Sequence, residues 1–218
     1  MFKLIAVVSM LIDHIGVAFY PDMILFRVVG RLAFPMFAYQ VAVSMKHTRS
    51  QSQYINNLFM WAVVAQIPYY LLLNPAGDMV GRLNILFTFA LTTLGVYYFQ
   101  TDALLEGFWR YARWGYLVAV ALACELFHCD YGLFGSLFVM VFLFFREVPA
   151  VMYLSFVILT VWYTFLSDVW VLICALGSIP FIWAYHEIEG VRVVRYRLAF
   201  YLFYPVHLMV LWLVKGAV

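Results

Sequence analysis

The chain has 218 residues, of which 67% are hydrophobic, 20% are aromatic and 11% are charged, with a formal net charge of +2. This composition excludes a soluble globular protein, because a soluble domain of this length needs a larger polar surface. Apolar runs of ~17–25 residues, long enough to cross a bilayer as helices, recur along the whole chain and predict an all-α, polytopic membrane protein. No segment is long and polar enough for a separate soluble domain, so residues 1–218 are expected to form a single transmembrane domain.

Nine apolar segments are predicted to be helices, each bounded by charges or by Pro, Gly and Asn clusters. The break between the fifth and sixth, Cys129-Asp-Tyr-Gly132, is either a tight hairpin or a dip in one long segment. Pro35 and Pro205 lie inside the second and ninth segments and are expected to kink or interrupt them. In chain order the segments are 3–20, 23–45, 54–73, 83–99, 113–128, 132–145, 149–166, 169–185 and 198–214.

The lysines and arginines predict the orientation of the chain in the membrane. If the N-terminus is cytoplasmic, nine of the 13 basic residues fall on the cytoplasmic side, and only Arg82 and Lys215 fall outside. Arg27 and Arg31 lie inside the second segment. This bias predicts a multi-pass protein of the cytoplasmic (inner) membrane, with the C-terminus outside.

Four ionisable side chains are predicted to meet at one depth of the membrane. Asp13 and His14 lie near the middle of the first segment, Arg31 near the middle of the second and His207 at the middle of the ninth. An Arg or Asp at a helix centre costs ~2.5–3.5 kcal/mol on insertion scales. An Asp13–Arg31 ion pair that only locks two helices together is one explanation. It does not explain the two histidines, which indicate proton handling.

Helical geometry limits how these groups can pair. Adjacent residues point about 100° apart, so Asp13 is not placed to orient His14, whose partner is expected to come from another helix. Asp13 is expected to pair with Arg31 or with Arg27, one turn away on the same face. Asn84, at the start of the fourth segment, is either a helix cap or a substrate contact.

Polar residues near the ends of the segments give weaker indications. Gln66 precedes Pro68 by two residues and is expected to satisfy backbone carbonyls that the proline frees. Two basic clusters lie at the cytoplasmic rim, and they indicate either contact with anionic lipid or capture of a phosphorylated cofactor. A Gly-rich phosphate loop, an H-E-x-x-H motif and metal-ligand spacing are absent from the sequence, so no metal site and no nucleic-acid partner are expected. The clusters are Lys46-His-Thr-Arg49 and Arg192, Arg195 and Arg197.

An ordered series of motifs begins with Ile12-Asp-His-Ile-Gly16 and ends with Phe203-Tyr-Pro-Val-His-Leu208. This series resembles the TraX family of membrane acetyltransferases. The family is named for a protein of conjugative plasmids that acetylates the N-terminal amine of pilin. The resemblance therefore implies acetyl-coenzyme A as the acyl donor, and pilin or another membrane-held amine as the acceptor. The motifs cover essentially the whole chain in order. They are Ile12-Asp-His-Ile-Gly16, Val29-Gly-Arg-Leu-Ala-Phe-Pro35, His47-Thr-Arg49, Gln66-Ile-Pro68, Asn84-Ile-Leu-Phe-Thr88, Asp130-Tyr-Gly-Leu-Phe-Gly135 and Phe203-Tyr-Pro-Val-His-Leu208.

Acetyl transfer to an amine needs a base, a stabilised oxyanion and a held thioester. His14 is the expected general base, because an α-amine with a pKa near ~8 needs only a base of modest strength. His207 is expected to handle a second proton or to orient His14, and a covalent acetyl-His14 intermediate is the alternative. Arg31, with Asn84 or Tyr131, would stabilise the oxyanion or position the thioester. The remaining candidate contacts to the coenzyme are Arg27, His47, Arg49 and Arg195.

Two functions of other classes stay open on the sequence. A small transporter would use Asp13, His14, Arg31 and His207 as a proton or ion relay, although the chain halves show no internal repeat. A non-catalytic assembly factor for a secretion or pilus apparatus would use the same polar groups only to lock helices together. Binding of acetyl-coenzyme A separates the acetyltransferase from both.

Overall fold

Helices make up the fold that the computed structural model describes, for residues 1–73, 82–101, 106–187 and 197–217. These residues contain no β-strand, only an isolated bridge between Leu83 and Cys129, so the prediction of an all-α protein is confirmed. Every predicted apolar segment coincides with one helix or with two consecutive helices. The elements are α1 (Phe2–Phe19), α2 (Ile24–Gly30), α3 (Ala33–His47), α4 (Gln51–Leu73), α5 (Ile85–Thr101), α6 (Phe108–Ala112), α7 (Trp114–Leu126), α8 (Gly132–Phe145), α9 (Pro149–Ser167), the 3-10 helix η2 (Trp170–Ser178), α10 (Ile179–Glu187) and α11 (Arg197–Ala217).

Several of these elements are long and apolar enough to cross a membrane. Among the described residues, five stretches meet this condition by length and composition, and α5 and α8 are shorter apolar helices. The chain is therefore a multi-pass membrane protein, while nine crossings and the N-in, C-out orientation stay predictions. The five stretches are Phe2–Phe19, Ile24–His47, Pro149–Ser167, Trp170–Glu187 and Ala199–Ala217.

The second predicted segment is broken in its middle, between α2 and α3. Pro35 is the third residue of α3 and has no backbone N–H to donate to the carbonyl of Arg31, so the helical hydrogen-bond pattern stops there. Arg31 consequently lies at the joint where the chain changes direction. Pro205 has no such effect, because α11 continues unbroken through it.

The α7–α8 connection is a tight hairpin, the first of the two alternatives that the sequence left open. His128 and Tyr131 adopt left-handed backbone conformations, with φ of 48° and 62°, and reverse the chain within a few residues. The strand-like bridge then fastens this turn to the start of α5: the Leu83 N–H donates to the His128 carbonyl (3.2 Å), and the Asp130 N–H donates to the Leu83 carbonyl (2.9 Å). The turn is therefore held by backbone contacts on both sides.

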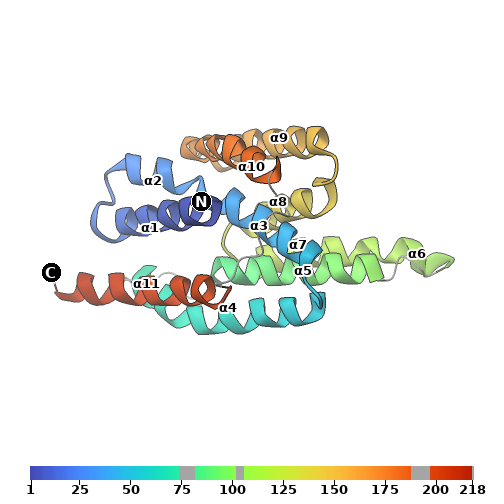
Figure 1. Ribbon diagram of the computed structural model, residues 1–218, viewed down its shortest axis with the longest axis horizontal. Helices are drawn as coiled ribbons and strands as arrows, with labels where there is room; N and C mark the ends of the chain where they lie inside the picture. Colours follow the sequence, from blue (N-terminus) through green and yellow to red (C-terminus); the bar gives the residue numbers. More distant parts are fainter. Residues whose placement is uncertain (74–81, 102–105, 188–196, 218) are drawn as a thin grey trace.

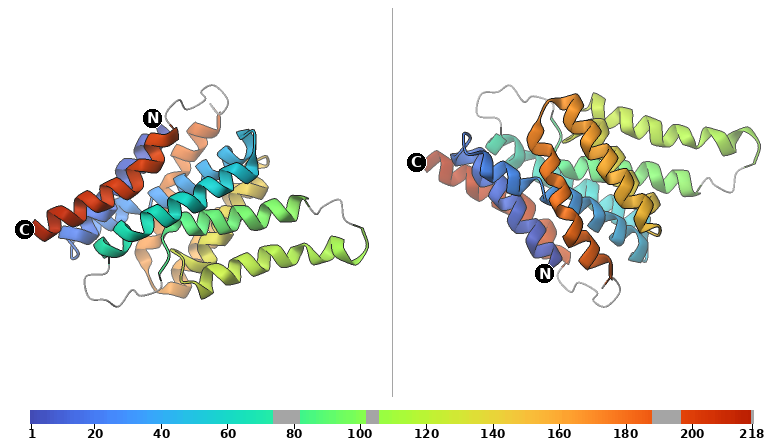
Figure 2. Two further views of the ribbon diagram at one scale, coloured as in Figure 1. Left: turned by 90° about the horizontal axis from the view of Figure 1, so that it is seen from below. Right: turned by 90° about the horizontal axis from the view of Figure 1, so that it is seen from above.

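α3 lies at the centre of the bundle and packs against α1, α8 and η2. Most of its side chains are buried, including Met36, Ala38 and Tyr39, which are inaccessible to solvent. In Figure 1, α9 and α10 form the upper edge and α4 and α11 the lower edge, with α1, α3 and α8 between them. α5 and α7 pack side by side and extend beyond the other helices (Figure 2).

Candidate functional site

A cavity with a volume of about 1210 Å3 lies between the helices. α4 forms one wall along most of its length, because both Gln53 near its start and Leu73 at its end line the cavity. The helical rise from residue 53 to residue 73 amounts to about 30 Å. The cavity therefore extends from His47, at the predicted cytoplasmic rim, to Arg82, at the predicted outer rim. Of the predicted site residues, those that line it between these ends are Asp13, His14, Arg27, Arg31 and Tyr131.

His14 on α1 and His207 on α11 form a hydrogen-bonded pair at this cavity. Nδ1 of His14 lies 2.8 Å from Nε2 of His207, and Nδ1 of His207 lies 2.7 Å from the Phe203 carbonyl oxygen. A carbonyl oxygen only accepts hydrogen bonds, so Nδ1 of His207 carries a proton. In neutral His207, Nε2 is then an acceptor, and His14 must donate from its Nδ1. Neutral His14 therefore keeps a lone pair on Nε2, the nitrogen left for a molecule in the cavity.

Asp13 pairs with Arg27 rather than with Arg31. Oδ2 of Asp13 lies 3.0 Å from Nη1 of Arg27, one of the two pairings that the sequence predicted. Two glycines let α1 and α2 approach closely enough for this contact. A Cβ atom on Gly30 would overlap the side chain of Asp13, and one on Gly16 would overlap Phe26. The ion pair and the glycine contacts together fix α2 against α1.

Arg31 donates a hydrogen bond from Nη1 to the Tyr131 hydroxyl, at 2.8 Å. The left-handed conformation of Tyr131 costs a non-glycine residue about 1–3 kcal/mol, and its ring is held by stacking on Phe34, with centroids 4.2 Å apart. Since Arg31 is the donor in this bond, the hydroxyl hydrogen of Tyr131 is left for another acceptor. Nε of Arg31 also has no partner among the described residues. The Tyr131 hydroxyl is thus a donor at this corner of the cavity that Arg31 does not use, while Nε of Arg31 is buried.

The prediction that Asn84 contacts the substrate is wrong, because Asn84 is fully buried and does not line the cavity. Its Oδ1 accepts the Leu86 N–H (3.0 Å) and caps α5, as the alternative interpretation predicted. Its Nδ2 donates to the Ala62 carbonyl and to Oε1 of Gln66, both at 2.8 Å. Nε2 of Gln66 donates to the Arg82 carbonyl (2.8 Å). Gln66 therefore joins α4 to the residues before α5, and the expectation that it serves the carbonyls freed by Pro68 is wrong.

The predicted coenzyme contacts at the cytoplasmic rim have different positions. His47 lines the cavity, together with its neighbour Thr48. Arg49 is exposed and is not among the residues that line the cavity, so a direct contact between Arg49 and the coenzyme is not supported. Arg195 lies outside the described residues. Arg27 does line the cavity, although it is also held by its ion pair.

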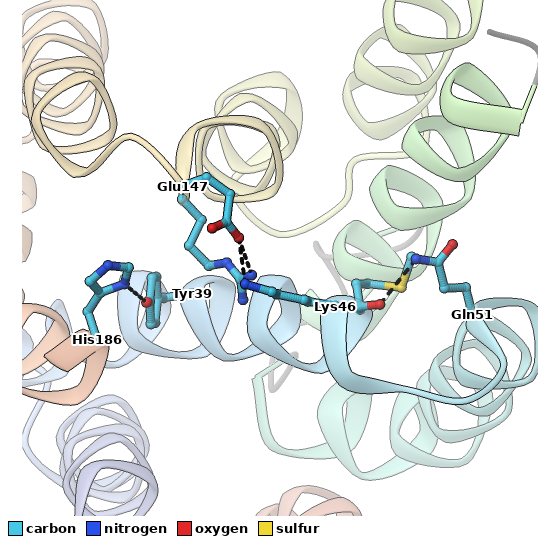
Figure 3. Close-up of polar contacts among 7 residues, drawn as sticks. Tyr39, Lys46, Gln51, Glu147 and His186 are labelled. Atoms are coloured by element: carbon cyan, nitrogen blue, oxygen red, sulfur yellow. Dashed lines mark hydrogen bonds and ion pairs between the residues drawn. The ribbon is translucent and has the colours of Figure 1, made fainter. Parts of the chain in front are cut away.

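Contacts at the middle and at the C-terminal end of α3 fix this wall of the cavity (Figure 3). Toward its middle, the Tyr39 hydroxyl forms a 2.6 Å hydrogen bond with Nδ1 of His186 on α10. Near its end, Nζ of Lys46 and Nη2 of Arg146 each lie 2.8 Å from the same oxygen of Glu147. Hydrogen bonds from Lys46 and Arg146 lower the pKa of the Glu147 carboxyl to about 2. Lys46 therefore serves to join α3 to the α8–α9 connection.

Polar stripes on α3 and α4 form part of the site that the sequence interpretation missed. Their members recur at spacings of three or four residues, which places them on one face of each helix. This polar spacing inside apolar segments is the signal that would have found them. Most are amides or hydroxyls, which both donate and accept hydrogen bonds, so this end of the cavity suits a ligand that carries amide groups. The cavity-lining members that were missed are Gln40 and Ser44 on α3, and Gln53, Tyr54, Asn57 and Trp61 on α4; the predicted contact His47 continues the stripe on α3.

Comparison with known proteins extends over nearly the whole chain. The family model described as "TraX protein" matches residues 1–215. The chain is 27% identical over 229 aligned residues to "Probable fimbrial assembly protein FimC, serogroup H1" of Dichelobacter nodosus, which covers 96% of this chain and 92% of that protein. It is 32% identical over 136 residues to "Protein TraX" of Escherichia coli. That match covers 62% of this chain and 51% of the relative, about half of its length. No solved structure matches.

Proposed function

The chain belongs to the TraX family, and from this membership and the geometry of the cavity we propose that it is an acetyltransferase of the inner membrane. It transfers the acetyl group of acetyl-coenzyme A to the amine of a membrane-held acceptor, most simply the N-terminus of a pilin or fimbrial subunit. The printed name of the Dichelobacter nodosus relative, a fimbrial assembly protein, supports an acceptor of this kind.

The observation that carries the proposal is the fixed tautomer of His14. The hydrogen bonds from His207 to the Phe203 carbonyl and from His14 to His207 leave Nε2 of His14 unprotonated at the cavity. A base with its lone pair held in one direction is what proton transfer from an attacking amine requires. An ion pair that merely locked helices together would not need two coupled imidazoles.

The proposed reaction uses the groups on the cavity wall in sequence. The neutral acceptor nitrogen attacks the thioester carbonyl carbon, and Nε2 of His14 takes a proton from that nitrogen as the C–N bond forms. The carbonyl oxygen becomes an oxyanion, which the hydroxyl of Tyr131 and the guanidinium of Arg31 stabilise by hydrogen bonds and charge. The C–S bond then breaks, and His14 returns the proton to the departing thiolate. The products are the acetylated amine and coenzyme A, with His14 neutral again.

The size of the cavity fits a reaction with two substrates. Sites for one small molecule usually measure about 300–1,000 Å3, and this cavity measures about 1210 Å3. The amide and hydroxyl stripes of α3 and α4 match the two amide groups of the pantetheine arm of the donor. His47 and Thr48 at the rim would contact its phosphates. The donor thus enters from the cytoplasmic end, and its acetyl group reaches His14.

Acetylation of a peptide amine by the purified protein tests the proposal directly. The protein in detergent would be incubated with acetyl-coenzyme A and a peptide with the N-terminal sequence of a pilin, and the product measured by mass spectrometry. His14→Ala is expected to lower the rate by about 10²–10⁴-fold while the thermal shift with acetyl-coenzyme A persists. His128→Asn is the matched control, because His128 is exposed and its left-handed backbone suits asparagine. Wild-type protein that neither binds acetyl-coenzyme A nor acetylates any amine would refute the proposal.

One observation favours a second function, a transporter. The cavity is lined by residues near both ends of α4, as a transport pathway would be. Liposomes that contain the protein and a pH-sensitive dye distinguish the two functions. Proton flux that is lost in His14→Ala, without acetyl transfer in the wild type, would identify the transporter.

A further inference from the structure

We infer that Asp130 binds the acceptor, as a protonated primary amine, in a tyrosine-lined pocket. This pocket lies at the end of the cavity opposite the polar stripes of α3 and α4. This inference rests on the proposed function and makes it more specific. It limits the acceptor to ammonium compounds and excludes neutral hydroxyl acceptors such as sugars. It concerns capture of the acceptor, before the ammonium releases one proton to water and becomes the neutral nucleophile whose second proton His14 takes.

The backbone of Asp130 is held on two sides, so its side chain has a fixed origin in the cavity wall. Its N–H donates to the Leu83 carbonyl (2.9 Å), and its carbonyl accepts a hydrogen bond from the Thr88 hydroxyl (2.8 Å). The Asp130 side chain lines the same cavity as His14. A carboxylate that is positioned this firmly beside an open volume is suited to bind a ligand rather than to join two helices.

Asp130 has no cationic partner of its own in the described part of the chain. Arg31, the arginine whose charge acts most strongly on Asp130, is already hydrogen-bonded to Tyr131. The Tyr69 hydroxyl is hydrogen-bonded to the Asp130 carboxyl, and Arg31 and Arg82 act on it only through their charge. Burial raises the pKa of Asp130 to about 6 against these effects. At neutral pH the group is therefore a buried negative charge without an ion-pair partner, and such a charge favours a cation.

Tyrosine rings complete the pocket around this charge. Four tyrosines interact electrostatically with Asp130, and all four line the cavity. Aromatic faces attract ammonium groups, and phenolic oxygens accept hydrogen bonds from them. A primary ammonium has three N–H donors, which a carboxylate and phenolic oxygens can satisfy together. A neutral hydroxyl has one O–H donor and no charge, so it would gain neither the ion pair with Asp130 nor the attraction to the aromatic faces. The four tyrosines are Tyr69, Tyr131, Tyr163 and Tyr204.

The position of this pocket relative to the reacting groups suits the proposed chemistry. Asp130 is the chain neighbour of Tyr131, whose hydroxyl is bonded to Arg31. An amine held at Asp130 therefore lies next to the groups proposed to stabilise the oxyanion, while the donor reaches them from the amide stripes of α3 and α4. The two substrates meet from opposite ends of one cavity.

Asp130→Asn tests the inference, because it removes the charge and keeps an oxygen for the Tyr69 hydroxyl. We expect the KM for the amine peptide to rise about 10- to 100-fold, as for the loss of a charged hydrogen bond, with kcat and the KM for acetyl-coenzyme A near their wild-type values. Asp130→Glu should restore part of the amine affinity, and Asp22→Asn, at an exposed aspartate between α1 and α2, is the matched control.

The pH dependence of kcat/KM for the amine is a second test, because a purely structural role of Asp130 would not change it. The carboxyl of Asp130 takes up a proton as the pH falls through about 6 and loses the charge that holds the ammonium. The wild-type kcat/KM for the amine should therefore fall more steeply below pH 6 than that of Asp130→Asn.

The outcomes separate this inference from the proposed function. A wild-type protein that acetylates the peptide, with an Asp130→Asn variant of unchanged amine KM, overturns only the role of Asp130. Loss of acetyl-coenzyme A binding in both Asp130→Asn and Asp130→Glu would show that Asp130 serves folding, which also overturns the inference. Absence of acetyl transfer in the wild type refutes the enzyme itself.

Discussion

Replacement of His207 by leucine is expected to slow acetyl transfer without weakening the binding of acetyl-coenzyme A. Leucine fills a similar volume but cannot accept the hydrogen bond that His14 donates from Nδ1 at 2.8 Å. The Phe203 carbonyl also loses its side-chain donor, 2.7 Å away. His207 is not among the residues that line the cavity, so the donor itself should bind as before.

The magnitude follows from the hydrogen bond that is lost. A buried polar group left without a partner costs about 1–3 kcal/mol. If the orientation of the His14 imidazole matters in the transition state and not in the ground state, this energy is added to the activation barrier. At about 1.4 kcal/mol for each factor of ten, the rate should fall about 5- to 150-fold. The effect should be smaller than that of removing His14, because the base itself is still present.

His207→Gln is the control for the orienting role, because glutamine offers an oxygen to His14 and an N–H to the Phe203 carbonyl. Single-turnover acetyl transfer is measured by quench-flow, and the thermal shift with acetyl-coenzyme A tests whether each variant is folded. The rate of His207→Gln should be much higher than that of His207→Leu. Equal rates for the leucine variant and the wild type would refute the reasoning. So would a glutamine variant as slow as the leucine variant.

Three further substitutions test other parts of the site. Tyr131→Phe removes the hydroxyl proposed for the oxyanion and should lower kcat about 10- to 1,000-fold with little change in the KM for acetyl-coenzyme A; a change confined to KM in steady-state kinetics would contradict that role. Gly30→Ala should displace the Asp13 side chain and destabilise the protein by about 1–3 kcal/mol in detergent unfolding, whereas Gly115→Ala, where a Cβ meets nothing within 4 Å, should be neutral. Asn84→Ala should destabilise the fold by about 1–3 kcal/mol and leave the kcat of the folded fraction unchanged, so a selective loss of kcat would return this residue to the active site.

The helices could be predicted from the sequence because hydrophobicity is the dominant local signal in a membrane protein. The runs from Phe2 to Phe19 and from Pro149 to Ser167 needed no tertiary information. The break at Arg31 was also foreseeable, since Pro35 removes one backbone donor at a known offset. The tight α7–α8 turn stayed ambiguous because residues larger than glycine, His128 and Tyr131, occupy two of its three left-handed positions, and only Gly132 is of the type that usually marks such conformations.

The site was predictable where one helix determines the geometry, or where equal depth in the membrane brings side chains together, as for His14 and His207. The 100° step along α1 correctly separated Asp13 from His14. The choice of Arg27 over Arg31 as the partner of Asp13 depends on how closely two helices approach, and the sequence does not contain that distance. Asn84 was ambiguous for a related reason, since a helix cap and a substrate contact use the same side chain. Asp130 was part of a recognised motif, but its role depends on a cavity that several helices enclose.

The interrupted helix around Arg31 also has a consequence for biogenesis. A broken helix leaves backbone carbonyls without internal partners, which hydrocarbon tolerates only where protein or water replaces lipid. Two arginines in the same stretch add about 5–7 kcal/mol against its entry into lipid as a lone helix. The stretch from Ile24 to His47 should therefore leave the translocon together with the preceding helix, whose aspartate neutralises one of those arginines. Partition of the isolated segment into microsomal membranes, with and without that helix, would measure this dependence.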